Sequence, residues 1–169
     1  RIFKQAKEMV AENPDWENHK TLVLANHDWH PGVIGIVASR MTDEFSKPTI
    51  LIALRDDGTG TGSGRSWAGF DLYAGLSSCR EHVIGYGGHK AAAGVRLKAT
   101  AVSLVRETLA AWAAENFHPT PEDTELAIDA EVLLKEVNLR AVQELERLGP
   151  FGQANPQPRF VANRVDLAE

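Results

Sequence analysis

The sequence has 169 residues, of which 43% are hydrophobic and 24% are charged, and its formal net charge is −5. This composition is typical of a globular protein and argues against disorder, a collagen-like repeat or a coiled coil. No run approaches the ~18 consecutive apolar residues of a membrane span, and a single cysteine, Cys79, excludes an internal disulfide framework and a CxxC zinc site.

The first half of the chain predicts helices that alternate with buried strands. Apolar residues at helical spacing predict an amphipathic helix over residues 1–13, which Pro14 ends. Short apolar runs predict strands at 21–25 and 48–54. Between them, residues 30–40 fit a helix with Pro31 at its first position, although their many β-branched residues leave a strand open.

The second half continues this alternation. Asp71 is suited to cap a short helix whose Leu72, Leu76 and Cys79 point inward. The remaining predictions are a strand at 95–97, a helix at 101–116, a linker at 118–121, an edge strand at 125–130, a helix capped by Asn138 and a strand from Phe160. We expect an α/β fold with a mixed, partly parallel sheet flanked by helices, and a short C-terminal strand segment from a truncated neighbouring domain.

Charge is unevenly distributed along the chain. Residues 30–98 hold 8 Lys and Arg against 6 Asp and Glu, whereas residues 99–169 hold 6 against 12. The mildly basic middle segment is also rich in glycine. The excess of two positive charges indicates an anionic partner for this segment, even though the whole chain is acidic. A chance distribution of charges is the alternative.

The first candidate site is Gly60-Thr61-Gly62-Ser63-Gly64-Arg65-Ser66, in which glycine occupies every second position. Because glycine lacks a Cβ atom, the backbone N–H groups of such a segment can approach a ligand closely. Ser63 and Ser66 add hydroxyl donors, and Arg65 adds a planar fork of donors that matches phosphate oxygens. The spacing is not that of a Walker loop. A glycine-rich hairpin whose arginine meets a surface carboxylate is the alternative.

The second candidate site is Gly87-Gly88-His89, followed by Lys90 and a run of small residues. Two glycines allow a tight turn that exposes the imidazole, which can donate to a phosphate oxygen or serve as an acid. A glycine turn with a solvent-facing histidine is the alternative.

A third candidate is the segment from Asn26 to Pro31. His27, Asp28 and His30 are residue types that bind metal ions. The sequence offers no other cluster of ligands to complete the site, and a structural metal site usually needs four ligands. We therefore predict no metal here and place His30 at a strand-to-helix turn, where helix N–H groups favour an anion. Motifs for hydrolysis such as DxD, HExxH and GxSxG are absent from the sequence.

Together these segments resemble the DHH phosphoesterase family, and within it the RecJ-type exonucleases. The matching residues are 30–40, 63–66, 87–89 and 92–94, in the order and spacing of the DHH-associated domain. Residues 148–160 resemble the junction at which these exonucleases enter an OB-type domain. Smaller members of the family, and the related domain of alanyl-tRNA synthetase, lack this tail.

The resemblance implies a piece of a longer protein in three parts. These are an N-terminal linker helix at 1–19, a DHH-associated substrate-binding domain at 20–118, and a strand and helix at 119–169 that lead into a truncated OB-type domain. We expect residues 159–169 to lie as a strand against the main body or to be loosely ordered.

The resemblance also implies a function in DNA repair and recombination, as the DNA-binding fragment of a metal-dependent, single-strand-specific 5′→3′ DNA exonuclease of the cytoplasm. Mn²⁺ or Mg²⁺ would be bound by the DHH domain, whose triplet this sequence lacks, so we expect this piece alone to hold no metal and to be inactive. The implied partners are single-stranded DNA, a single-strand-binding protein and a helicase, with no membrane.

The site residues follow from the same resemblance. Ser63, Gly64, Arg65 and Ser66 would hold a DNA phosphate. Gly87, Gly88 and His89 would line the cleft near the scissile phosphate, with His89 as a candidate contributor to catalysis, and His30 would form part of the same wall. The alternatives are part of an oligoribonuclease or cyclic-dinucleotide phosphodiesterase, and a nucleic-acid-binding module without chemistry.

Overall fold

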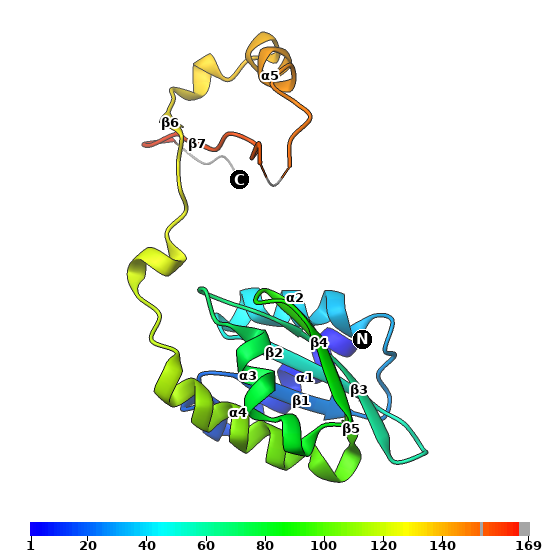
Figure 1. Ribbon diagram of the computed structural model, residues 1–169. Helices are drawn as coiled ribbons and strands as arrows, with labels where there is room; N and C mark the ends of the chain where they lie inside the picture. Colours follow the sequence, from blue (N-terminus) through cyan, green and yellow to red (C-terminus); the bar gives the residue numbers. More distant parts are fainter. Residues whose placement is uncertain (153, 166–169) are drawn as a thin grey trace. The chain divides into compact units, whose positions relative to one another are not determined.

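A computed structural model describes residues 1–152 and 154–165 and divides the chain into two compact units, Arg1–Thr124 and Glu125–Glu169 (Figure 1). The first unit contains a five-stranded sheet with helices packed on both faces. The second contains a two-stranded sheet and helix α5 (Leu139–Glu146). The predicted mixed, partly parallel α/β class is therefore confirmed.

The five-stranded sheet has the order β1-β2-β3-β5-β4. Its strands are β1 (Leu22–Asn26), β2 (Thr49–Leu54), β3 (Thr59–Arg65), β4 (Gly85–Gly88) and β5 (Ala92–Lys98). Strands β1 and β2 are parallel and the other pairs are antiparallel. A parallel pair needs a crossover connection, and α2 (Ile34–Phe45) supplies it. The strand alternative for residues 30–40 is therefore wrong, and Pro31 lies in a turn before the helix.

Two apolar clusters hold the first unit together, one on each face of the sheet. Helices α1 (Ile2–Ala11) and α2 cover one face, on which Leu24 and Leu51 are buried. Helices α3 (Leu72–Ser78) and α4 (Val102–Asn116) cover the other, against Ile50 and Val95. The first unit also has short 3-10 helices at Pro14–Glu17, Arg80–His82, Ala99–Ala101 and Pro121–Thr124, and the second unit has one at Leu134–Glu136.

Helix α3 begins as the sequence predicts. The Asp71 carboxylate accepts a hydrogen bond from the backbone N–H of Ala74 at 2.9 Å, which satisfies a donor that the first helical turn leaves free. Leu72, Leu76 and Cys79 are fully buried. The short helix is thereby fixed against the sheet.

Glycine at every second position of β3 is a packing feature. A Cβ atom at Gly60 would lie 2.8 Å from Ile52 Cγ2, one at Gly62 would lie 2.6 Å from Val95 Cγ1, and one at Gly64 would lie 2.8 Å from Leu72 Cδ2. These glycines let large apolar side chains fill the space above the strand. The expectation that their backbone N–H groups approach a ligand is corrected, because β3 is a central strand that pairs with β2 and β5 on its two sides.

The second unit is built on a short parallel pair, β6 (Ala130–Glu131) and β7 (Phe160–Val161). The edge strand predicted at 125–130 is wrong for residues 125–129, and only Ala130 lies in a strand. Alternating apolar and polar residues form a strand only where another strand lies beside them to complete the hydrogen bonds. The predicted Asn138 cap is confirmed, because its side-chain oxygen accepts from the N–H of Ala141 at 3.0 Å. Of the segment 159–169, β7 pairs with β6 of its own unit, and residues 166–169 lie outside the described residues.

Candidate nucleic-acid interface

The face of the sheet opposite α3 and α4 presents the polar residues of β3. Because side chains alternate along a strand, Thr59, Thr61, Ser63 and Arg65 share this face, whereas the glycines between them point into the core. Helices α1 and α2 cover this face in part. We call its positions on β3, β5 and β4 the open face, to which β5 contributes Ala92, Gly94, Arg96 and Lys98 and β4 contributes Gly85 and Gly87. Helix α2 packs on β2 and β3. On the strands that it does not cover, the open-face positions Gly94, Arg96 and Lys98 of β5 and Gly85 and Gly87 of β4 are exposed.

A glycine of α2 leaves space for the two predicted phosphate ligands of β3. A Cβ atom at Gly35 would lie 3.1 Å from the Ser63 hydroxyl and 3.1 Å from Nη2 of Arg65. The start of the helix therefore approaches both side chains closely. This contact places Ser63 and Arg65 together, as the sequence predicts.

Arg65 is partly buried and is held by its own strand. Its Nη1 donates to the carbonyl of Gly64 at 2.8 Å and to the hydroxyl of Ser63 at 3.2 Å. No ion pair among the described residues includes Arg65. A guanidinium in this position has donors left for an anion, and a surface carboxylate is not its partner.

Two predicted ligands take other roles. Gly64 points into the core and positions Arg65 through its carbonyl, so it is not suited to contact a phosphate with its backbone N–H. The Ser66 hydroxyl donates to the carbonyl of Phe70 at 2.6 Å, and its N–H donates to the carbonyl of Ala91. Ser66 therefore fastens its loop and joins β3 to the turn before β5.

The turn between β4 and β5 brings His89 to the same end of the sheet as Arg65. The N–H of His89 donates to the carbonyl of Ala92 at 2.9 Å, and Ala92 is the β5 partner of Arg65. Gly88 makes this turn possible, because its φ is +138° and a Cβ atom there would lie 2.4 Å from the Ala92 oxygen. The His89 side chain is exposed.

Both candidate histidines are fixed in the same way. Nδ1 of His89 accepts from the N–H of Ala91 at 3.3 Å, and Nδ1 of His30 accepts from the N–H of Gly32 at 3.1 Å. An imidazole that accepts at Nδ1 carries its proton on Nε2 when neutral, so each ring is assigned an Nε2–H donor for a ligand. His30 lies in the predicted turn before α2, where its carbonyl accepts from the N–H of Ile34.

A shallow groove of about 330 Å³ lies on the sheet over β3, β4 and β5. Its walls include Thr61, Gly85, Gly87, Gly94 and Arg96. Arg96 was not among the predicted site residues. The signal was present, because the two-residue period of β5 puts Arg96 and Lys98 on the same face as Gly94.

The residues that the structure describes do not fit a metal ion. Among residues 1–152 and 154–165, no three His, Cys, Asp or Glu side chains are grouped so that they could hold one. Asp28, from the third candidate, lies 3.7 Å from the guanidinium of Arg1, and both side chains are largely exposed. In the same part of the chain, no helix has the length and apolar character to cross a membrane.

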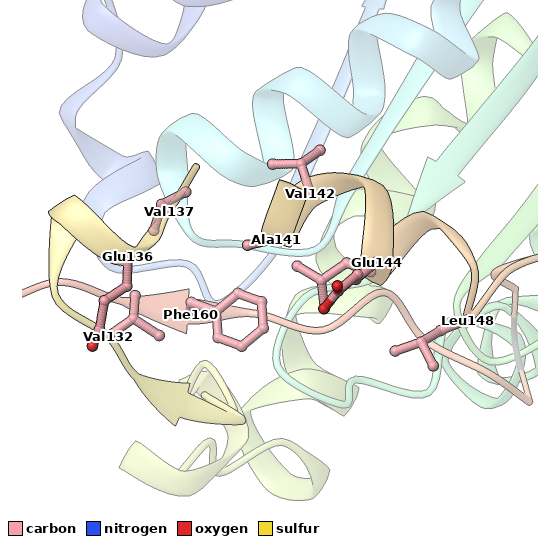
Figure 2. Close-up of a pocket in the computed structure, with 9 residues that line it drawn as sticks. Val132, Glu136, Val137, Ala141, Val142, Glu144, Leu148 and Phe160 are labelled. Carbon is pink, nitrogen blue, oxygen red and sulfur yellow. The ribbon is translucent and has the colours of Figure 1, made fainter. Parts of the chain in front are cut away.

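The second unit has a cavity of another character, with a volume of about 380 Å³. Figure 2 shows the Phe160 ring below α5, with Val132 on one side and Leu148 on the other. Its polar side chains are carboxylates, Glu136 and Glu144. An apolar hollow with acidic residues in its lining is unsuited to a polyanion.

Comparison with known families gives two matches. The DHHA1 domain matches residues 18–115, and the RecJ OB domain matches residues 128–169. The single-stranded-DNA-specific exonuclease RecJ of Bacillus subtilis is 35% identical over the whole chain, which covers 21% of that protein. The same-named protein of Escherichia coli is 33% identical over 82% of the chain, which covers 25% of the relative.

Solved structures agree with these matches. The crystal structure of RecJ from Thermus thermophilus in complex with Mn²⁺ has a TM-score of 0.71 and 30% identity, over 95% of this chain and 24% of that one. The complex with Mg²⁺ has a TM-score of 0.68 and 30% identity, over 93% and 25%. The chain thus spans about a quarter or less of its relatives' length. The resemblance to RecJ-type exonucleases that the sequence indicated is confirmed. The chain belongs to the DHHA1 domain family, and its DHHA1 domain is followed by a match to the RecJ OB domain.

Proposed function

We propose that this chain is the DNA-gripping part of a single-strand-specific 5′→3′ exonuclease, a hydrolase of phosphodiester bonds that depends on Mn²⁺ or Mg²⁺. The observation that carries the proposal is Arg65, a partly buried guanidinium that its own strand holds in place and that has no carboxylate partner among the described residues. The names of the relatives and the metals in their crystal structures support it.

In this proposal the chain positions the substrate. Arg65 and Ser63 hold a phosphate of the DNA, and the Nε2–H groups of His89 and His30 donate to phosphate oxygens along the same wall. Holding a reacting group in the productive geometry removes entropy from the reaction barrier. Since the described residues do not fit a metal ion, the metal chemistry belongs to another part of the protein, and this chain alone is inactive.

The wider setting belongs to the same proposal. The substrate-binding domain covers residues 20–118 and follows a linker helix at 1–19, and residues 119–169 lead into the OB-type domain. Single-stranded DNA is the ligand, a single-strand-binding protein and a helicase are the partners, and the cytoplasm is the location.

The test is the affinity of Arg65→Ala for a short 5′-phosphorylated oligothymidylate, measured by fluorescence anisotropy in EDTA so that nothing is hydrolysed. Loss of a charge-assisted hydrogen bond costs about 1.5–3 kcal/mol, so we expect affinity to fall roughly 10- to 150-fold. The slope of log affinity against log salt should shrink by about 0.7 per lost phosphate contact.

Arg80→Ala is the matched control. Arg80 is exposed, follows α3 and lies away from the open face, so its removal should leave the affinity almost unchanged. Circular dichroism checks that both variants are folded. Equal affinities for Arg65→Ala and the unchanged protein would remove Arg65 from the proposed site.

A further inference from the structure

The open face carries positive charge at both ends. Arg65 lies at one end, and Arg96 and Lys98 stand at the other end on β5. The remaining open-face positions on β3, β4 and β5 are threonine, serine, alanine and glycine, so these positions carry three cations and no carboxylate. This is unexpected in a chain whose net charge is −5.

Arg96 and Lys98 are available to a ligand. Both are exposed, and neither takes part in an ion pair among the described residues. The pKa of the Asp57 carboxyl, in the turn before β3, is lowered mainly by hydrogen bonds from Thr59 and only to a smaller extent by the charge of Arg96. Its Oδ1 accepts from the Thr59 hydroxyl at 2.6 Å and from the Thr59 N–H at 2.9 Å, so the carboxylate is held within its own turn.

The end of the open face that carries Arg96 borders a hollow that protein atoms do not fill. Arg96 and Thr61 line the groove of about 330 Å³. A Cβ atom at Gly85 or at Gly87 would meet nothing within 4 Å, so both glycines border open space. A polymer that lies over β4 therefore meets no side chain at these two positions.

We propose that Arg96 and Lys98 form a second phosphate site, so that the open face holds a length of nucleic-acid backbone and not a single phosphate. The inference rests on the proposed function and adds the substrate class: a strand that spans both ends of the face. The two sites bind phosphates of the same strand, with the groove between them occupied by the intervening sugar and phosphate groups.

The register of the sheet sets the length of that strand. Arg65 pairs with Ala92, and Arg96 is four residues further along β5, which is about 13 Å at ~3.3 Å per residue. A stacked single strand advances ~3.4 Å per nucleotide, so about four nucleotides cover this distance, and fewer if the strand is extended. A dinucleotide held at Arg65 falls short of the second site.

The experiment measures how affinity depends on strand length. The full chain is titrated with 5′-phosphorylated oligothymidylates of two and eight nucleotides in EDTA at low salt. We expect the double variant Arg96→Ala/Lys98→Ala to weaken binding of the octamer by up to about fivefold per cation and to leave the dinucleotide unaffected. Arg80→Ala, which removes a cation elsewhere, should change neither.

A second variant tests the groove without removing charge. Gly85→Val places a side chain in open space beside Arg96, so the fold should be retained while the octamer binds several-fold more weakly. If both variants bind the octamer as the unchanged protein does, or if the dinucleotide is weakened to the same extent, the second site does not exist. Failure of Arg65→Ala to weaken either ligand would instead count against the proposed function, so the two failures are distinguishable.

Discussion

Arg65 owes its position to three neighbours that contribute no charge. The Gly64 carbonyl and the Ser63 hydroxyl accept from its guanidinium, and Gly35 of α2 leaves the space that the group occupies. The histidines are fixed by backbone N–H groups two residues further along the chain. At this scale the candidate site depends on main-chain atoms and missing side chains as much as on its charged groups.

Gly35→Ala tests this dependence. The added methyl would lie 3.1 Å from Nη2 of Arg65, so the flexible guanidinium must move while the helix gains a better helix former. We expect thermal stability to be unchanged or slightly raised, and affinity for phosphorylated single strands to fall several-fold. The measurements are a melting curve and the anisotropy titration. Unchanged affinity would show that Arg65 can shift without loss, so that its present position is not required for binding.

At the scale of elements, β3 separates packing from binding by strand alternation. Gly62 faces the core, where a Cβ atom would lie 2.6 Å from Val95 Cγ1, whereas a Cβ atom at Gly94 would meet only the Gly62 oxygen at an ordinary 3.7 Å. Both glycines lie in neighbouring strands of one sheet. Their substitution should therefore have opposite consequences.

Gly62→Ala and Gly94→Ala form a matched pair. Overpacking costs about 1–3 kcal/mol, so Gly62→Ala should lower the free energy of unfolding by that amount. Gly94→Ala should be neutral or stabilise by up to about 1 kcal/mol, because glycine weakens a strand. Urea unfolding followed by circular dichroism measures both. Equal destabilisation would mean that the two faces of the sheet are equally crowded.

The sequence predicted those elements whose signals are local. Strands β1 and β2 are apolar runs, and α3 and α5 begin at Asp71 and Asn138. The role of the β3 glycines was not predictable, because Ile52, Val95 and Leu72, which fill their space, come from three other elements. Strand alternation alone puts Arg96 on the face of Gly94, but its place at the groove depends on Thr61, its partner across the sheet, which lies 35 positions away in the sequence.

At the scale of the molecule, the basic open face belongs to an acidic unit. Residues 1–124 hold 13 Lys and Arg against 15 Asp and Glu, and residues 125–169 hold 5 against 8. Three cations on one face of such a unit create a local positive potential that the net charge conceals. If DNA binds as proposed, repulsion from the rest of the chain should keep it to this face, and added salt should weaken its binding.

The single cysteine provides a test of the first unit as a whole. Cys79 is fully buried between α3 and α4, and burial raises the pKa of its thiol. Because the thiolate is the reactive form, iodoacetamide near neutral pH should modify Cys79 only when the first unit unfolds. The rate of modification across a urea series should follow the loss of the first unit's helices. Rapid modification without urea would contradict the packing described for α3.

The seven residues of β3 have a consequence for how this protein tolerates change. Its even-numbered positions contact the apolar interior, and its odd-numbered positions lie on the open face, where we propose that DNA binds. In a saturation library along the strand, defects should therefore sort with a period of two: poor yield and low melting temperature at 60, 62 and 64, but well-folded protein with impaired DNA retention at 61, 63 and 65.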